Sequence, residues 1–152
     1  MTISVAAVEA EAVSRIVALT ATAYDQGGIS AAWTEATTMG PNIQAPAHMA
    51  HLRFQAAITD SPSANGERET PGGEARLRSR LDVSFSYILR QSQQRADARL
   101  ARDAANDIVK AMNVYHDEWD MEIVNAGRPA ISGDGRYLAI ALSFDIFHNI
   151  EV

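Results

Sequence analysis

Residues 77–112 constrain the fold most, because two different hydrophobic periods follow each other there. Over residues 77–89 apolar side chains fall on one side of an extended chain, and arginine, aspartate and serine fall on the other. This period of two predicts a β-strand with one buried face. The period then changes to three and four residues, which predicts a helix buried along one stripe, with Ser92 as its cap. The stripe consists of Leu100, Ala104, Ile108, Ala111 and Met112.

Further periodic segments predict an order of helix, two strands, helix and two strands. Helical spacing of apolar residues predicts the first helix over residues 4–24, ended by Gly27 and Gly28. Alternation predicts strands at 49–59, from 119 to 124, and at 137–148. Both faces of the last strand are nearly apolar, which favours a central position in the sheet.

This order predicts one α+β domain over residues 1–152, with an antiparallel or mixed sheet of about four strands and two helices packed on one face. Residues 29–48 form a connector with a short helix or strand around 31–36, in which Trp33 is expected to anchor the core. The polar run SPSANGERETPGG lies within residues 60–76. It is too long for a tight turn, so it predicts a hairpin with a flexible arm.

The charge distribution favours contacts with protein. The formal net charge of −6 argues against a general nucleic-acid coat. Residues 53–110 nevertheless carry ten basic and eight acidic side chains, whereas the remainder carries three basic and eleven acidic ones. Opposed charge in two parts of a chain suits contact between copies or with a partner. Arg76, Arg78 and Arg80 share one strand face, where they need an acidic group opposite them.

The sequence holds no catalytic motif, and we predict neither enzyme activity nor a cofactor or metal. The H-x-x-H spacing of His48 and His51 points the two rings to opposite faces of a strand, which disfavours joint metal binding. The acidic residues at 116–120 lack the spacing of a calcium loop and favour a solvated turn. No Cys is present, so thiolate chemistry is absent.

No basic leader with an apolar core and no run of about eighteen apolar residues occurs, so we expect a soluble protein made in the cytoplasm.

The succession of elements resembles the tail terminator proteins of long-tailed, siphovirus-type bacteriophages and, more loosely, related head–tail joining and neck proteins. Four segments carry the resemblance: the N-terminal helix, the long-armed hairpin through SPSANGERETPGG, the run LDVSFSYILR with QQRADARLARDAANDIVKAMN, and the closing strand RYLAIALSFDIFHNIEV. The resemblance spans nearly the whole chain and rests on element order.

The resemblance implies a virion protein of the tail or neck that forms a ring, typically a homohexamer, on the finished tail tube. Its partners are further copies of itself, the major tail protein and a head-completion or neck protein; DNA passes through the ring without sequence-specific contact. No membrane is involved. We expect the interface to include Arg76, Arg78, Arg80, Arg95, Arg99, Arg102, Glu67, Arg68 and Glu69.

Two alternatives remain open. One is another neck or head–tail connector protein with the same kind of subunit. The other is a small ligand-binding or enzymatic α+β domain with a pocket between sheet and helices, in which His51 or His148 acts as general base.

Overall fold

The computed structural model describes residues 5–23, 29–36, 46, 48–58, 63–64, 74–112, 119–125 and 129–151. Two helices occur in this part of the chain, α1 (Val5–Val17) and α2 (Gln94–Met112). The longer strands are β4 (Arg53–Ile58), β6 (Glu74–Ile88), β7 (Trp119–Asn125) and β9 (Tyr137–Glu151). The shorter strands are β1 (Thr20–Ala23), β2 (Ile29–Ala32), β3 (Thr34–Glu35), β5 (Ser63–Ala64) and β8 (Ala130–Ile131).

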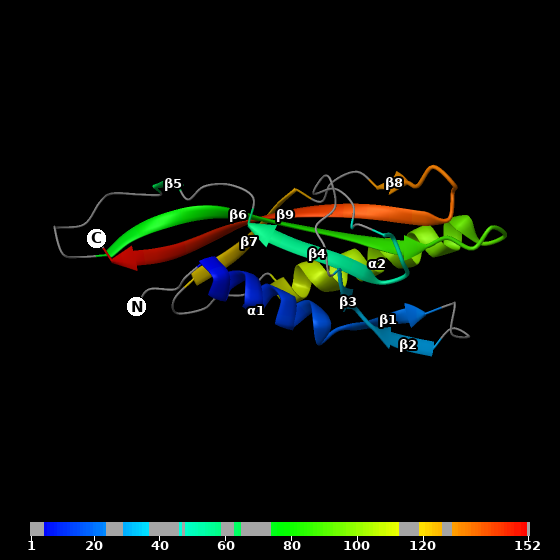
Figure 1. The fold of residues 1–152 in the computed structure, drawn as a ribbon, viewed down its shortest axis with the longest axis horizontal. Helices are drawn as coiled ribbons and strands as arrows, with labels where there is room; N and C mark the ends of the chain where they lie inside the picture. Colours follow the sequence, from blue (N-terminus) through cyan, green and yellow to red (C-terminus); the bar gives the residue numbers. More distant parts are fainter. Residues whose placement is uncertain are drawn as a thin grey trace.

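The sheet is mixed, and both helices lie on the same side of it (Figure 1). The strand order along it is β3-β4-β6-β9-β7, with β5 paired to β6 and β8 paired to β9. Only β3 and β4 run parallel among these pairs. The predicted α+β class with two helices on one face is therefore confirmed. The path has five strands where about four were predicted, because the connector contributes β3.

The pairing of β6 with β9 runs over the full length of both strands, 15 residues each. Leu81 lies opposite Phe144, and Phe85 lies opposite Ile140, all four of them buried. One residue of slippage would turn these apolar side chains to the opposite face, so the hydrophobic pattern specifies this register. The central place predicted for the last strand is confirmed, since β9 lies between β6 and β7.

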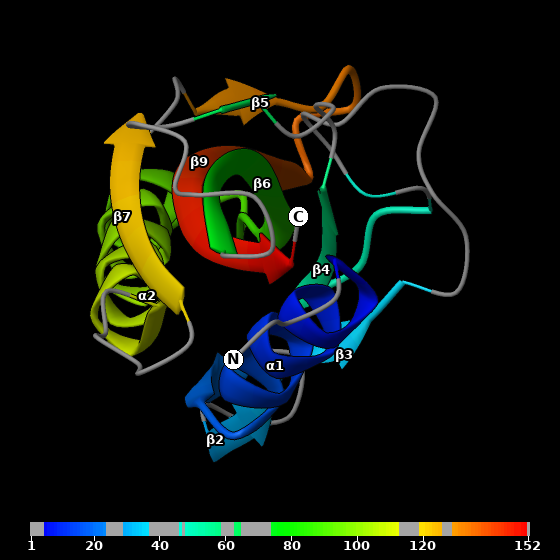
Figure 2. The same ribbon diagram turned by 90° about the vertical axis from the view of Figure 1, so that its left-hand side faces the viewer.

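The two helices divide the inner face of the sheet between them (Figure 2). Helix α1 packs against β4 and β3, whereas α2 packs against β9, β6 and β7. Each helix is also tied by a polar contact: the carboxylate Oε1 of Glu9 accepts the Ile58 N–H (2.7 Å), and Arg15 Nη1 donates to the Ala111 carbonyl (3.2 Å). The second contact satisfies a carbonyl in the last turn of α2, which has no partner within the helix.

Polar side chains on the opposite face of β6 are also buried. Asp82, Ser84 and Ser86 are at most 8% exposed. The Ser143 hydroxyl donates to Asp82 Oδ1 (2.5 Å), and the Ser86 hydroxyl both donates to the Ala50 carbonyl (2.6 Å) and accepts the Ala50 N–H (3.2 Å). These bonds offset the cost of removing Asp82 and Ser86 from water, whereas the buried Ser84 hydroxyl has no hydrogen-bond partner among the described residues. The middle of this face is therefore covered rather than solvated.

The first predicted helix is too long. Helix α1 ends at Val17, and residues 20–23 pair as β1 with β2, Thr20 lying opposite Ala32. The β-branched residues Thr20 and Thr22 favour this extended conformation over a further helical turn. The predicted end at Gly27 and Gly28 is wrong, and those two residues lie outside the description.

The second predicted strand starts too early, and the predicted cap of α2 is wrong. Strand β4 begins at Arg53 rather than at 49, because Leu52 has a φ of 57°, which interrupts an extended chain. The Asp97 N–H donates to the Gln93 carbonyl (2.9 Å), so Gln93 precedes the first helical turn instead of Ser92.

A turn at residues 132–136 joins β8 to β9. Gly135 has a φ of 72°, as expected for a glycine in the left-handed region. The Ser132 hydroxyl donates to Asp134 Oδ1 (2.6 Å), and the Arg136 N–H donates to the same oxygen (3.0 Å). The hydroxyl bond, followed by the backbone bond, lowers the pKa of the exposed Asp134 carboxyl.

Some residues of the predicted flexible arm at 60–76 belong to strands. Residues 63–64 form β5, which pairs with Arg78 and Leu77 of β6, and residues 74–76 already belong to β6. The rest of the arm lies outside the described residues.

Trp33 is the core anchor that the sequence predicted. Its ring is buried and meets Phe85 edge to face, with ring centroids 4.9 Å apart. We expect Trp33→Ala to lower the free energy of unfolding by about 3–5 kcal/mol, since it leaves a cavity over the sheet. Urea unfolding followed by circular dichroism measures this change. The exposed Val17 gives a control, because Val17→Ala should change stability by less than about 0.5 kcal/mol. Equal values for the two variants would contradict the core role.

Candidate protein interface

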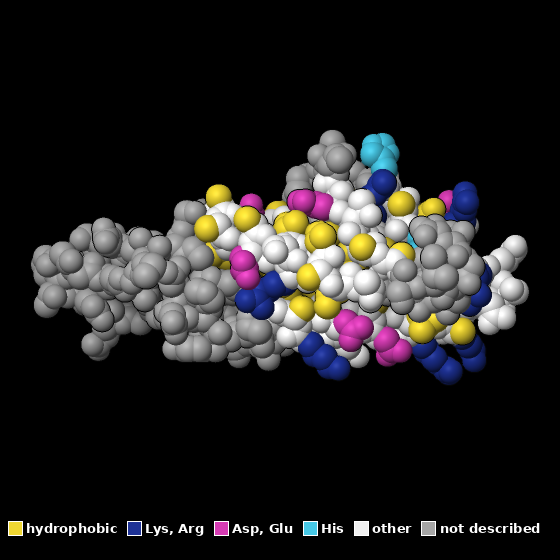
Figure 3. Space-filling model, turned by 90° about the horizontal axis from the view of Figure 1, so that it is seen from below, with side chains coloured by type: hydrophobic (Ala, Val, Ile, Leu, Met, Phe, Trp, Pro, Cys, Tyr) yellow, Lys and Arg dark blue, Asp and Glu magenta, His cyan; other side chains and the backbone are white. Residues whose placement is uncertain are grey.

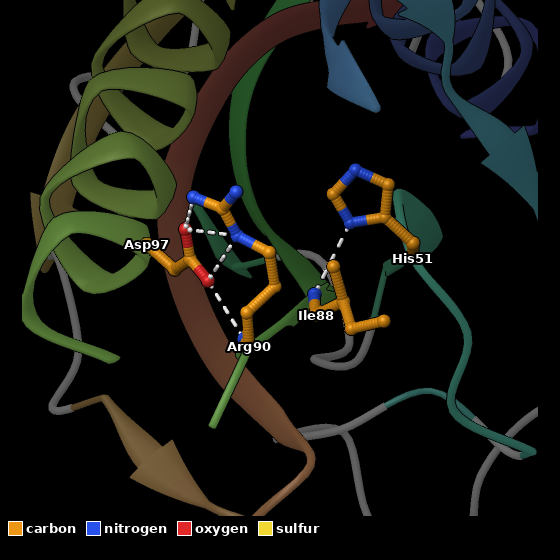
Figure 4. Close-up of polar contacts among 4 residues, drawn as sticks. All are labelled: His51, Ile88, Arg90 and Asp97. Carbon is orange, nitrogen blue, oxygen red and sulfur yellow. Dashed lines mark hydrogen bonds and ion pairs between the residues drawn. The ribbon is translucent and has the colours of Figure 1, made fainter. Parts of the chain in front are cut away.

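An ion pair fixes the start of α2 against the end of β6 (Figure 4). The Asp97 carboxylate is fully buried and accepts the Arg90 backbone N–H (2.7 Å). The guanidinium of the same arginine donates from Nη2 to Oδ1 (2.8 Å) and from Nε to Oδ2 (3.1 Å). A carboxylate in the first helical turn is also favoured by the helix dipole. Together these contacts set the direction of α2 relative to the sheet.

A second contact fixes the segment before β4 against the same end of β6. His51 Nδ1 accepts the Ile88 N–H (3.1 Å), and the imidazole ring meets Tyr87 edge to face at 4.6 Å. Acceptance at Nδ1 requires a lone pair there, so the hydrogen bond favours a neutral ring. His51 therefore serves as an acceptor for backbone. His48, the other member of the H-x-x-H pair, is exposed and has a φ of 52°.

Three predicted interface residues, Arg95, Arg99 and Arg102, form one exposed face of α2. Their spacing of four and three residues places them on one side of the helix. All three are exposed, and within the described part of the chain none makes a hydrogen bond or ion pair. We call these three residues the α2 arginine face. In Figure 3 several arginine or lysine side chains and acidic side chains project along the lower edge, and further charged side chains lie among the hydrophobic ones in the middle and at the upper edge.

Arg78 and Arg80, in contrast, have an acidic partner within the chain. Arg78 Nη1 lies 3.9 Å from Asp145 Oδ2, and Arg80 Nη2 lies 3.7 Å from Asp145 Oδ1. Asp145 stands directly opposite Arg80 in the β6–β9 register. The sequence required an acid facing these arginines, and the structure places one on the neighbouring strand. Part of their charge is thus already balanced inside the chain.

The remaining predicted interface residues are not placed as side chains. Arg76 lies in β6 opposite Asn149, and only its backbone is described. Glu67, Arg68 and Glu69 lie outside the described residues. The structure therefore brings together two groups of the predicted arginines, one on α2 and one on the outer face of β6.

Among the described residues no group of three His, Asp or Glu side chains is arranged to hold a metal ion. Of the acidic run at 116–120, the first three residues lie outside the description, and Asp120 lies in β7. His148, the other candidate general base, lies in β9 without a described side chain.

Two acidic residues with structural roles were missed from sequence. Asp145 lies on the polar side of the alternation in the last strand, and pairing of that strand with β6 would have placed it near the arginines. Asp97 gave no such signal, because its partner Arg90 meets it only through the turn between β6 and α2.

Comparison with known proteins does not assign the chain to a family. No protein-family model matches the sequence, and none of the curated proteins matches it. The helices within the described residues are too short or too polar to cross a membrane.

Because Asp97 is ion-paired with Arg90, we expect its replacement to cost more stability than replacement of an exposed aspartate on the same helix. We expect Asp97→Asn to lower the free energy of unfolding by about 1–2 kcal/mol, because it weakens charge-assisted hydrogen bonds to a half-exposed arginine. The matched control is Asp103→Asn on the exposed side of α2, which should cost less than about 0.5 kcal/mol. Thermal or urea unfolding compares the two. A cost for Asp97→Asn no larger than that of the control would contradict the anchoring role.

Proposed function

We propose that this protein is a structural, non-enzymatic virion protein that forms a ring on the end of a bacteriophage tail tube. The ring stops polymerisation of the tube and offers the joining surface for the head or neck. Its action is binding without turnover: one side of the ring copies the contact of the next tube layer, and the other side cannot accept a further layer. The order of helices and strands, which resembles that of tail terminator proteins, supports the proposal.

The observation that supports it most is the α2 arginine face. A solvated helix commonly carries both signs of charge in pairs, and a nearby acid would partly neutralise each arginine. Here the three exposed arginines form no ion pair among the described residues, even though the exposed Asp103 lies one helical turn from Arg99, whereas Arg78, Arg80 and Arg90 each form one. Arginine is enriched at protein interfaces because its planar group donates several hydrogen bonds at once.

The long β6–β9 ribbon supports the same role. Its pairing continues to Glu74 opposite Glu151, well past the last residue of β4, which pairs with Leu81 (Figure 1). Strand β5 pairs with β6 at Leu77 and Arg78, and β7 pairs with β9 up to His148, so only residues 74–76 and 149–151 extend beyond the described flanking strands as a two-stranded ribbon. This extension of the sheet is suited to contact with a neighbouring subunit or with the tube beneath it.

A neck or head–tail connector is the second candidate, since the arginine face and the ribbon would serve it equally. The two roles differ in the structure that is bound: a terminator binds the tube end, and a connector binds the head side. The test therefore has to include tail tubes.

Electron microscopy of purified protein with and without tubes of the major tail protein tests the proposal. We expect rings, or tubes capped at one end and arrested in length, because occupied ends cannot add layers. Light scattering of the free protein gives its mass in parallel. A monomer of about 16 kDa that leaves tube length and tube ends unchanged would contradict a terminator role. The control is a tube preparation with the Trp33→Ala variant, whose core we expect to be destabilised.

A further inference from the structure

The α2 arginine face consists only of hydrogen-bond donors, so its partner has to supply acceptors. A guanidinium group has five N–H donors and no acceptor. Carboxylates and phosphates are the groups it binds best, often through two hydrogen bonds at once, and backbone carbonyls are weaker acceptors. The protein itself is acidic, with a formal charge of −6. A second copy of the chain is therefore a chemically suitable partner.

Hydrogen-bond acceptors that have no donor among the described residues lie on the other side of the molecule, at β3. This strand ends the sheet at the edge opposite β7, while α2 packs beneath the β9 and β7 side (Figure 2). The Thr34 N–H donates to the Leu52 carbonyl and the Ala36 N–H to the Phe54 carbonyl, so the backbone of Glu35 between them faces away from β4. Glu35 is exposed, and among the described residues neither its carboxylate nor its backbone makes a hydrogen bond or ion pair.

The charge pattern decides between two kinds of self-contact. A two-fold contact centred on the α2 arginine face would oppose arginines with arginines, which is repulsive. A heterologous contact instead joins two different surfaces and repeats from copy to copy, closing into a ring when the rotation allows. The two surfaces identified here lie on opposite sides of one molecule, as such a repeat requires.

We propose that the α2 arginine face of one copy binds the β3 edge of the next, with the Glu35 carboxylate and its outward backbone carbonyl as acceptors. The inference rests on the proposed ring function and names its subunit contact. Because the groups are exposed, the contact weakens as salt screens the charges, over a Debye length of about 8–10 Å at physiological ionic strength.

A charge swap tests this pairing. Arg99→Glu and Glu35→Arg each place like charges in the contact, so we expect each variant alone to raise the dissociation constant for self-assembly at least tenfold, roughly a 1.4 kcal/mol change. The double variant Arg99→Glu/Glu35→Arg restores opposite charges and should regain most of the assembly. A mixture of the two single variants should also assemble, since each supplies the surface that the other complements. Mass photometry or light scattering gives the constants, and circular dichroism checks folding.

The control is Arg136→Glu, which changes the net charge equally at an exposed arginine in the β8–β9 turn and should leave assembly unchanged. Wild-type-like assembly of Arg99→Glu would overturn the inference, as would failure of both the double variant and the mixture to recover. Should the wild-type protein bind DNA, an Arg99→Glu variant that assembles normally but no longer binds DNA would also overturn the proposed subunit contact.

These outcomes separate the two proposals. If the wild-type protein self-assembles through this contact but leaves tubes uncapped, the terminator role fails and the subunit contact stands. If tubes are capped by protein whose assembly ignores the charge at Arg99 and Glu35, the contact fails and the terminator role stands.

Discussion

The uninterrupted pairing of β6 with β9 is the constraint on which the rest of the structure depends. It fixes which side chains of both strands face the helices, since alternation gives the core Leu81, Val83 and Phe85 from one strand and their apolar partners from the other. The same register puts Asp145 beside Arg80 on the far side. Other strands add to the two edges of this pair, helix α2 packs on its apolar face, and α1 packs on the neighbouring β4 and β3.

The position of helix α2 depends on the β6–β9 pair. The chain leaves β6 at Ile88, and the buried Asp97 binds the backbone and guanidinium of Arg90 immediately afterwards. The helix therefore lies beneath the sheet with a fixed rotation about its axis, because Ala101, Ile108 and Met112 are buried on its inner side. The α2 arginine face points outward as a consequence. The proposed partner surface is thus held by the core rather than by a loop.

The sequence predicted the parts of the fold in which one physical signal dominates. Strict alternation identified β6 and β9, and three- and four-residue spacing identified α2. In other parts of the chain the same residues fit two conformations about equally well, and a single sequence does not show which one forms. Residues 20–23 are rich in Ala and Thr, so they fit both a helix and the strand β1 that they form. Leu52 has positive φ without being Gly or Asn, and hydrogen bonds to and from its backbone hold it there.

The candidate interface was predicted in part for the same reason. Arginine positions on strand and helix were readable from spacing, but the division between neutralised and unneutralised arginines was not. Asp145 balances Arg78 and Arg80 across the β6–β9 pairing, 65 residues along the chain from Arg80, whereas no described acid forms an ion pair with Arg95, Arg99 or Arg102. The arginines of α2 are therefore the better candidates for contact with another copy of the protein in the proposed assembly.

A cryo-electron microscopy map of the protein bound to the end of a tail tube would test this proposal most directly. We expect a closed ring in which α2 of each copy lies at the boundary with its neighbour, and its arginines contact the β3 edge of that neighbour. A ring in which α2 faces solvent on every copy, or a tube end without bound protein, would contradict it.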